Sequence, residues 1–414
     1  MAGETTVQCA IAGGGPAGMM LGVLLARAGV DVLVLDKHAD FLRDFRGDTI
    51  HPSTLEIVHE LGWLREFLTL PHEQVPELRA QFGDVTTTFA DFRYLPTRCR
   101  FVALMPQWDF LDFLARHGAA YPTFRLRMRV EAKGLLEEDG RVVGLEASTP
   151  AGPLRVRADL VVAADGRDST LRPRAGLPGE AFGAPMDVLW FRLSRVPGDP
   201  TAVMGRFDAG RIFISLNRGE HWQCGFVIAK GSLDDLRAGG IDAFRREVAR
   251  LMPHAADRVG EIRSWDDVNL LTVQVDRLRR WYRPGLLCIG DAAHAMSPVG
   301  GVGINLAIQD AVAAANRLAG PLAAGRVTTD DLRAVQRRRA LPTRLTQRLQ
   351  LAVQRRVIAS VLATRGPLRP PLFFRLLARL PVLRRLPARL VGVGVRPEHV
   401  HSAAQPAART IAST

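Results

Sequence analysis

Three separated segments of this sequence combine glycines with acidic residues, a combination that can hold phosphate groups and sugar hydroxyls. They are Gly13–Gly18 (GGGPAG), Asp165–Arg172 (DGRDSTLR) and Gly290–Asn305, in which Gly290-Asp291 leads into a glycine-rich loop. A dinucleotide bound in an extended conformation needs contacts at its adenosine end, its pyrophosphate and its ring end. Distant parts of one chain are a natural way to supply them. Together, the three segments indicate an FAD-dependent oxidoreductase.

The first segment lies between a predicted strand and a predicted helix. The run Val7–Ala12 is almost continuously apolar, as in a parallel strand buried on both faces, and Met19–Ala28 is rich in Leu, Met and Ala. Glycines here allow a tight turn, a close approach of the backbone to pyrophosphate, and close packing of helix on strand. The helix N-terminus offers unpaired N–H groups to the anion. We assign to this site Gly13, Gly15, Pro16, Ala17 and Gly18.

An acidic residue ends the next predicted strand. Val30–Leu35 (VDVLVL) is followed by Asp36, whose carboxylate is placed to accept hydrogen bonds from the adenosine ribose hydroxyls. The order of strand, glycine loop, helix, strand and acid is much more specific than a glycine motif alone. We therefore assign Asp36 and the adjacent Lys37 to the adenosine end of the site.

The third segment follows another predicted strand, Gly285–Ile289. An acid at the end of such a strand, here Asp291, can bind a ribityl or ribose hydroxyl. The loop Ser297–Gly303 then leads into a predicted helix, Ile304–Leu318, whose N–H groups and positive dipole end can face the N1/O2 side of an isoalloxazine ring. The residues assigned here to the cofactor are Gly290, Asp291, Gly303, Ile304 and Asn305.

On these motifs the chain resembles the group A flavoprotein aromatic hydroxylases, the p-hydroxybenzoate hydroxylase family, over roughly residues 7 to 340. Family members have a D-G motif contacted by both FAD and NAD(P)H, and a G-D motif that holds the ribityl chain. The resemblance places Asp165, Gly166 and Arg172 at the first of these. It also implies that Arg46 lies near the FAD pyrophosphate and that Gln107 reaches the same cofactor before a helix.

The implied fold is α/β: a Rossmann-like FAD-binding domain of the glutathione-reductase type, interleaved with a β-sheet substrate domain and followed by C-terminal helices. The FAD-binding domain is expected in three pieces, 1–75, 101–180 and 270–340. The β-rich substrate domain is expected in 76–100 and 181–269. The remaining ranges are a helical segment, 341–397, and a tail expected to be disordered, 398–414.

The second sheet would cover the flavin, with substrate between the sheet and the ring. Short predicted strands at 188–193, 202–207, 211–216 and 222–228 would form it together with 85–94. Strand alternation places Trp190 and Arg192 on one face, where Arg192 could bind a substrate carboxylate or phenolate. The candidates to line the pocket are Trp190, Arg192, Phe213, Trp222 and Phe226, although a core position is as compatible with each aromatic residue.

The family chemistry begins when NADPH or NADH reduces FAD by hydride transfer. Reduced flavin then reacts with O2 to give a C4a-hydroperoxide, and an electron-rich carbon of a small aromatic or polyketide-like substrate takes up one oxygen atom. We expect Pro298, Gly300 and Gly301 to shape the ring environment. The sequence identifies no acid or base; His51 and His294 are the nearest candidates by position. Epoxidation, Baeyer–Villiger insertion and N-oxidation would use the same hydroperoxide.

Composition favours a cytoplasmic enzyme with reduced thiols. The four cysteines (Cys9, Cys99, Cys224, Cys288) lack paired or metal-ligand spacing, so neither disulfides nor a metal is expected. The net charge of +13 is carried almost entirely by arginine, without a nucleic-acid-binding module, so no nucleic acid partner is expected. No signal peptide or membrane-spanning run is evident.

Two questions stay open at this level. The basic, leucine-rich stretch Pro367–Val395 could lie on an anionic membrane surface, pack on the flavin domain or cover a dimer interface, so that the protein is a monomer or a homodimer. Other functions compatible with the motifs are an FAD-dependent reductase of a prenyl or other lipid-like substrate, and a flavin-binding protein that is not an oxygenase. The halogenase signature W-x-W-x-I-P is absent.

Overall fold

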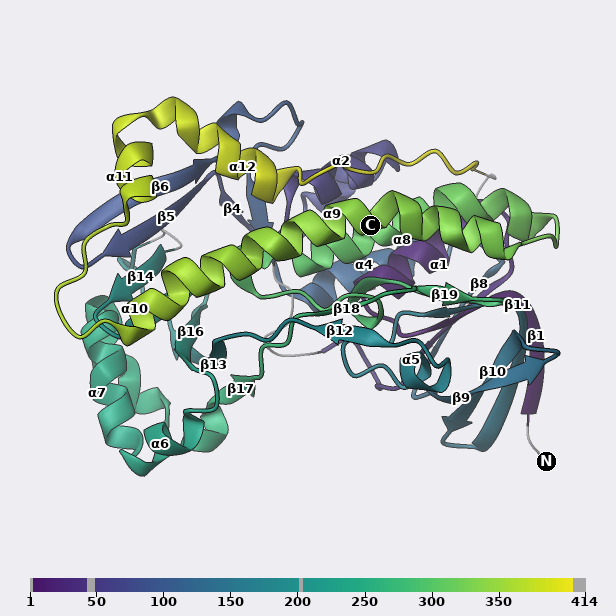
Figure 1. The fold of residues 1–414 in the computed structure, drawn as a ribbon, viewed down its shortest axis with the longest axis horizontal. Helices are drawn as coiled ribbons and strands as arrows, with labels where there is room; N and C mark the ends of the chain where they lie inside the picture. Colours follow the sequence, from purple (N-terminus) through teal and green to yellow (C-terminus); the bar gives the residue numbers. More distant parts are fainter. Residues whose placement is uncertain (1–2, 43–48, 201–203, 405–414) are drawn as a thin grey trace.

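Two sheets lie next to each other along the long axis of the molecule, and a long C-terminal helix runs across both of them (Figure 1). The computed structural model describes residues 3–42, 49–200 and 204–404. The predicted α/β fold class is confirmed, because an FAD-type mixed sheet, a second β-sheet and C-terminal helices are all present.

The first sheet has the strand order β19-β20-β11-β1-β2-β8. Its strands from β20 to β8 are parallel, which fits their nearly continuous apolar sequence, since helices and further strands cover both faces. The bounds are β1 (Gly3–Ala12), β2 (Val32–Asp36), β8 (Phe124–Met128), β9 (Glu131–Glu138), β10 (Arg141–Thr149), β11 (Gly152–Ala163), β19 (Tyr282–Arg283) and β20 (Leu286–Cys288).

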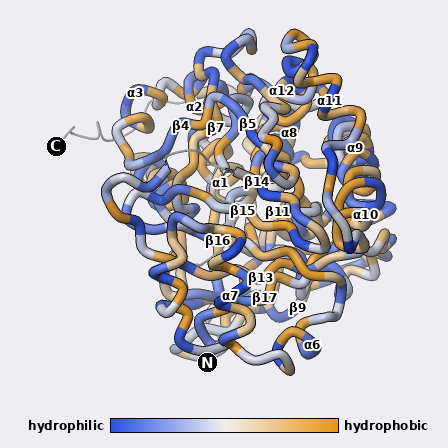
Figure 2. The backbone as a smooth tube through the Cα atoms, turned by 90° about the vertical axis from the view of Figure 1, so that its left-hand side faces the viewer, coloured by the Kyte–Doolittle hydropathy of each residue, from blue (hydrophilic) through white to orange (hydrophobic). Residues whose placement is uncertain are grey.

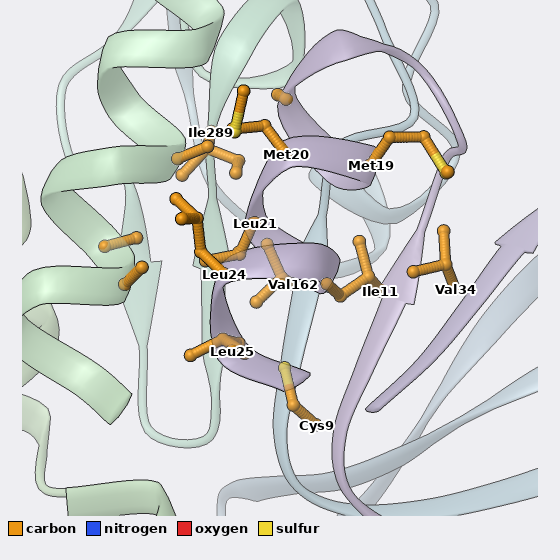
Figure 3. Close-up of a cluster of buried hydrophobic side chains, with 14 of the residues drawn as sticks. Cys9, Ile11, Met19, Met20, Leu21, Leu24, Leu25, Val34, Val162 and Ile289 are labelled. Atoms are coloured by element: carbon orange, nitrogen blue, oxygen red, sulfur yellow. The ribbon is translucent and has the colours of Figure 1, made fainter. Parts of the chain in front are cut away.

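Helix α1 (Pro16–Arg27) packs tightly on this sheet. Ten of its residues are buried, and Figure 3 shows its leucines Leu21 and Leu24 among Ile11 of β1 and Val162 of β11. The glycine loop therefore leads from the buried end of β1 into a largely buried helix, so its backbone position is fixed by the core on both sides.

A β-hairpin formed by β9 and β10 extends the sheet through β11. Asp139 and Gly140 connect the two strands with φ of 49° and 74°, and two positive φ values are typical of the two-residue turn that matches strand twist. An Asp-Gly pair is typical of this turn type, so the local sequence accounts for the hairpin.

The second sheet has the order β17-β13-β16-β15-β14-β5-β6. One of its faces packs on α7 (Ile241–Leu251) through a separate aromatic core. The strand bounds are β5 (Glu77–Phe82), β6 (Val85–Asp91), β13 (Met186–Ser194), β14 (Met204–Asp208), β15 (Arg211–Asn217), β16 (His221–Ala229) and β17 (Asn269–Leu271). Where one domain ends and the next begins stays a prediction.

Short ladders connect the two parts. Strands β12 (Gly179–Ala181) and β18 (Asp276–Leu278) pair where the chain leaves the first sheet and returns to it. A small sheet of β3 (Thr49–Ile50), β7 (Val102–Leu104) and β4 (Glu73–Val75) forms a second connection, where the chain leads to strands β5 and β6 of the second sheet and returns from them. Intervening helices are α2 (Pro52–Glu60), α3 (Leu64–Phe67), α4 (Gln107–Gly118), α5 (Leu171–Arg174) and α6 (Leu233–Ala238).

The C-terminal part is helical. Its elements are α8 (Gly303–Ala323), α9 (Thr329–Val353), a π-helical turn (Gln354–Ile358), α10 (Ala359–Ala363), α11 (Leu372–Arg379) and α12 (Arg385–Gly392). None of the helices in the described ranges has the length and apolar run that crossing a bilayer requires.

The expectation of a disordered tail from residue 398 is wrong for residues 398–404. Glu398 is buried and pairs with Arg338 and Arg339 of α9, and Val400 packs on the main core. Glu398 is buried because it neutralises the buried Arg339, which is far away in the sequence. The polar composition of the tail gives no indication of this pairing. The last ten residues of the predicted tail lie outside the described ranges.

Candidate active site

The glycine loop leaves no room for side chains at two positions. Gly13 has φ of 107°, and a Cβ there would lie 2.2 Å from the carbonyl oxygen of Ala164. A Cβ at Gly18 would lie 1.9 Å from the carbonyl oxygen of Gly13. At Gly15, the residue before α1, a Cβ would meet nothing within 4 Å. The open side of the loop is thus at Gly15, where a pyrophosphate would approach.

Unpaired N–H groups surround this open side. The first backbone hydrogen bond of α1 runs from Met19 N to Gly15 O, and Pro16 has no N–H. The N–H groups of Ala17 and Gly18 therefore have no backbone acceptor within the described ranges, as expected for the start of a helix. They and the positive helix end suit a pyrophosphate.

Asp36 ends β2 beside the glycine loop. Its Oδ2 accepts a hydrogen bond from Gly14 N at 2.9 Å, and its Oδ1 accepts one from His38 N at 2.9 Å and lies 2.8 Å from His38 Nδ1. Lys37 is exposed at the same strand end. His38 was not singled out from the sequence, since a histidine two residues beyond the strand carries no motif.

The D-G segment lies against the glycine loop. Asp165 follows β11, and its Oδ2 accepts hydrogen bonds from Thr170 N and Leu171 N at 2.8 and 3.1 Å. Its Oδ1 is buried with no donor among the described residues. Gly166 has φ of 85° and open space around it, whereas Arg172 turns towards Asp276 at 3.2 Å. The unpaired oxygen of Asp165 fits a hydroxyl donor of a bound ligand.

The G-D segment completes the convergence of the three motifs. A Cβ at Gly290 would lie 3.1 Å from Cβ of Ala17, so this turn packs directly on α1. The Asp291 carboxylate lies 3.5 Å from the guanidinium of Arg167 in the D-G segment. The sequence assignments do not include Arg167, although it lies inside the D-G motif. Its positive charge next to an expected binding site for an anionic dinucleotide could have identified it.

A buried ionic cluster holds the G-D turn from behind. Asp310 of α8 accepts a hydrogen bond from Gly290 N at 3.1 Å, lies 2.6 Å from His294 Nε2, and accepts one from Arg339 Nε at 2.9 Å. Arg339 also pairs with Glu398 at 3.2 Å. Burial opposes ionisation of Asp310, but His294 and Arg339 lower its pKa overall. His294 thus takes part in the contact that holds the G-D turn.

The glycine-rich loop after Ser297 is tied to the N-terminal part of the chain. Gly300 and Gly301 have φ of 79° and 61°, and Thr49 Oγ1 donates to Gly301 O at 2.7 Å. The Asn305 side chain bonds His51 N, Thr54 Oγ1 and Thr49 O, so its amide serves the protein framework. The first backbone bond into α8 comes from Leu306 N, which leaves the N–H groups of Gly303, Ile304 and Asn305 without backbone acceptors in the described structure.

Two glutamines of α9 and the first residue of the π-helical turn fix the preceding loop, Ala295–Val299. Gln347 Nε2 donates to Ala295 O, and Gln350 both accepts from Ser297 N and donates to Ser297 O and Val299 O. Gln354 Nε2 donates to Ser297 Oγ at 2.6 Å, and its Oε1 is buried with no donor in the described ranges. Pro298 therefore lies between two residues, Ser297 and Val299, whose backbone groups are hydrogen-bonded. The sequence does not indicate this arrangement, because glutamines on an arginine-rich helix are expected to be exposed to solvent.

His51 is buried and neutral at neutral pH. Burial lowers its pKa to about 4, partly offset by the hydrogen bond between its Nδ1 and Val391 O of α12 at 2.7 Å. Gln107, assigned to the cofactor, is the partly buried first residue of α4. Arg46 lies outside the described residues.

The five pocket candidates do not share one face, so the assignment of Phe213, Trp222 and Phe226 to a common pocket with Trp190 and Arg192 is wrong. The three residues are buried in the core against Phe244 of α7. Trp190 packs on the opposite face with other apolar residues of that side, and the strand register puts Arg192 on its face as expected. Alternation gives two faces but does not tell which one is covered by a helix.

The comparisons with known proteins agree with this geometry. The family model described as FAD binding domain matches residues 5–348. The chain is 33% identical over 388 residues to 6-methylpretetramide 4-monooxygenase from Streptomyces rimosus, which covers 93% of this chain and 92% of that one. It is 29% identical over 305 residues to rifampicin monooxygenase from Streptomyces venezuelae, covering 73% of this chain but 61% of the relative, about three fifths of its length. The solved structure of p-nitrophenol 4-monooxygenase from Pseudomonas putida superposes with a TM-score of 0.76 at 20% identity, covering 94% and 97% of the two chains.

Proposed function

This chain belongs to the FAD binding domain family and is an FAD-dependent monooxygenase, and we propose that it inserts one atom of O2 into a small aromatic or polyketide-like substrate. The observation that carries the proposal is the contact of all three motifs: Gly13 with Asp165, Ala17 with Gly290, and Arg167 with Asp291. The similarity to a monooxygenase of 6-methylpretetramide extends over nearly the full length of both chains and supports the substrate class.

The described residues fit FAD. Asp36 would hold the adenosine ribose, and the N–H groups of Ala17 and Gly18 would hold the pyrophosphate. Asp165, Asp291 and Arg167 would contact the hydroxyl-bearing middle of the dinucleotide. The N-terminus of α8 would face the ring, beside Pro298, Gly300 and Gly301. We extend this proposal to Gln107 and Arg172, whose placement beside the same ligand rests on the family resemblance.

When bound and reduced by NADPH or NADH, FAD would supply the oxygen chemistry through its C4a-hydroperoxide. The protein would contribute an apolar wall from the face of the second sheet that carries Val188 and Trp190, and the glutamine-held loop at Ser297–Val299. This wall would exclude water from the ring. Arg192 on the same face is our candidate for a substrate carboxylate or phenolate.

The test is NADPH and NADH oxidation by the purified yellow protein with a panel of phenols, aromatic acids and polycyclic aromatic polyketides, with products followed by mass. Substrate-stimulated oxidation with a product heavier by one oxygen atom is expected. Bound FAD without stimulated oxidation by any panel member, but with reduction of a prenyl substrate, would contradict the monooxygenase proposal.

A further inference from the structure

The net positive charge of the chain resides in one segment. Leu332–Pro397 contains sixteen arginines and no Asp or Glu, whereas the whole chain has a net charge of +13. The rest of the chain is therefore net negative by three charges. Such an asymmetry between parts of one chain indicates an anionic partner for the basic part.

The same segment carries most of the exposed apolar side chains. Of the fifteen large apolar residues exposed in the described ranges, ten lie between Leu332 and Pro397. They are Leu341, Leu345, Leu349, Leu372, Phe373, Leu376, Leu380, Val382, Leu386 and Leu390. Single exposed leucines need no explanation, but a concentration of them on one part of the surface marks a binding face.

On α9, leucine and arginine alternate along one outward stripe. Leu341, Leu345 and Leu349 recur every four residues, and Arg344 and Arg348 lie next to them on the same exposed side. The opposite side of the helix is buried and carries the glutamines that hold the active-site loop. The leucines of this stripe could become buried only if α9 rotated, and such a rotation would break the hydrogen bonds between its glutamines and the loop.

Helix α11 is apolar on two sides. Its inner side packs on the second sheet, where Phe374 contacts Phe82 and Phe89. Its outer side exposes Leu372, at 78%, with Phe373 and Leu376. A helix that is apolar on both sides is typical of one buried between two partners, and the part of the chain that the structure describes supplies only one of them.

These helices lie on one side of the molecule. Figures 1 and 2 place α9, α10, α11 and α12 along the same side, and Figure 2 shows hydrophobic and hydrophilic residues alternating along them. We call the exposed residues of α9, α11 and α12 the C-terminal face.

An arginine-lined groove adjoins the C-terminal face. Its cavity of about 430 Å³ is bounded by β19 and α9 and lined by arginines, among them Arg279, Arg337 and Arg344. Within the described ranges, none of these three forms an ion pair with a carboxylate. Nearby Arg277 has a lowered pKa because it is partly buried and because Arg344 and Arg348 add repulsion, which outweighs the opposite effect of Glu180. Among the described residues, Arg279, Arg337 and Arg344 thus give the groove positive charge that no carboxylate neutralises.

We propose that the C-terminal face binds the surface of an anionic lipid bilayer, with the leucines and Phe373 in the interface and the arginines on lipid phosphates. Basic residues interspersed with Leu and Phe on one surface are the pattern of interfacial helices. A second copy of this chain would bring the exposed arginines of the C-terminal face of one protomer against those of the other. A nucleic acid would engage the arginines but leave the leucines exposed.

The experiment uses the FAD-loaded full chain and sedimentation with phosphatidylcholine vesicles, with and without phosphatidylglycerol. Binding about tenfold tighter, or more, is expected with phosphatidylglycerol. Two variants separate the contributions: Leu372→Ser/Phe373→Ser/Leu376→Ser removes apolar surface, and Arg375→Glu/Arg379→Glu reverses charge. Each is expected to lower vesicle binding at least about tenfold. All five positions are exposed, so unchanged FAD absorbance and melting temperature will confirm folding.

The matched control is Arg246→Glu/Arg263→Glu, an equal charge change at exposed positions around α7. It is expected to bind vesicles like the wild type. Absence of binding to phosphatidylglycerol vesicles would overturn the proposal. So would binding that the serine variant leaves unchanged and that heparin abolishes for every variant, because the surface would then recognise a polyanion by charge alone.

Discussion

Arg167 and Asp291 join two motifs that are far apart in the sequence: the guanidinium Nη2 of the first lies 3.5 Å from the carboxylate Oδ2 of the second. Both side chains are partly exposed, and Arg167 Nε is buried without an acceptor among the described residues. The arginine therefore has an unused donor next to an acid assigned to the cofactor. This arrangement suits a cation that orients Asp291 and contacts the anionic ligand itself.

Arg167→Met should weaken FAD binding by about tenfold, because a charge-assisted contact at the middle of the dinucleotide is lost. The control is Arg174→Met, the same substitution at an exposed position of α5. FAD fluorescence titration of both apoproteins measures the effect. Equal affinities of the two variants would show that Arg167 is a surface partner of Asp291 only.

Two glycines of the loop should respond in opposite ways to alanine. Gly18→Ala places a Cβ against the backbone oxygen of Gly13 and should destabilise the protein by about 2 kcal/mol or more. Gly15→Ala has a compatible φ of −76° and open space, so its thermal stability should stay at or slightly above that of the wild type. FAD affinity should nevertheless fall at least about tenfold in Gly15→Ala, since the new methyl group meets the pyrophosphate. Melting curves of apoprotein and FAD titration separate the two effects.

The parts of the fold that could be predicted are those fixed by local sequence. β1, the glycine loop, α1 and β2 follow each other without interruption, and their apolar runs match strands and a helix buried on all sides. The hairpin at Asp139-Gly140 is equally local. In the second sheet the strands could be located, but the covered face could not, because Phe213 and Trp190 have similar local surroundings and only the position of α7 distinguishes them.

Relationships between distant residues escaped prediction for a different reason. Arg339 and Gln350 belong to a helix rich in arginine and glutamine, a composition typical of an exposed helix. They are buried because their partners, Asp310 and the backbone of Ser297, lie on another helix and a loop. A polar side chain becomes a core residue only when its partner is known, and the sequence does not show the partner.

Arg339→Leu should lower the free energy of unfolding by about 3–5 kcal/mol, because the buried carboxylates of Asp310 and Glu398 would lose the cation that lies between them. The control is Arg337→Leu, two residues away on the exposed side of the same helix, which should change stability by less than about 0.5 kcal/mol. Urea denaturation gives both values. Similar stabilities of the two variants would contradict a structural role for the buried cluster.

The free energy of unfolding should decrease as the pH falls, because the unfolded chain binds a proton at His51 that the folded protein does not. The pKa of His51 is lowered to about 4 in the folded protein from 6.5, so between these values the unfolded chain takes up a proton that the folded chain does not. The stabilising effect of the neutral imidazole is complete above about pH 6.5 and decreases by roughly 3 kcal/mol on the way to pH 4. His51→Gln removes this group, so the difference in unfolding free energy between wild type and variant should shrink as the pH falls. A difference that stays constant over this range would contradict the burial of a neutral His51.

The two faces of the second sheet should separate substrate binding from stability. Phe226→Ala empties a site in the core against α7 and should cost about 3–5 kcal/mol, with KM for the aromatic substrate unchanged in the protein that remains folded. Trp190→Leu changes a partly buried residue on the other face. Trp190 belongs to the same apolar cluster as Val188 and Val299, and Val299 is part of the loop that we propose lies beside the flavin ring. The substitution should raise KM several-fold and increase the NADPH oxidation that is not coupled to product, because the substrate is held less firmly at the ring. Steady-state kinetics with product quantification, together with melting temperatures, distinguishes the two variants.

If Phe226→Ala raised KM and Trp190→Leu left it unchanged, the substrate would lie on the α7 face, and the assignment of the covered face to the core would be wrong.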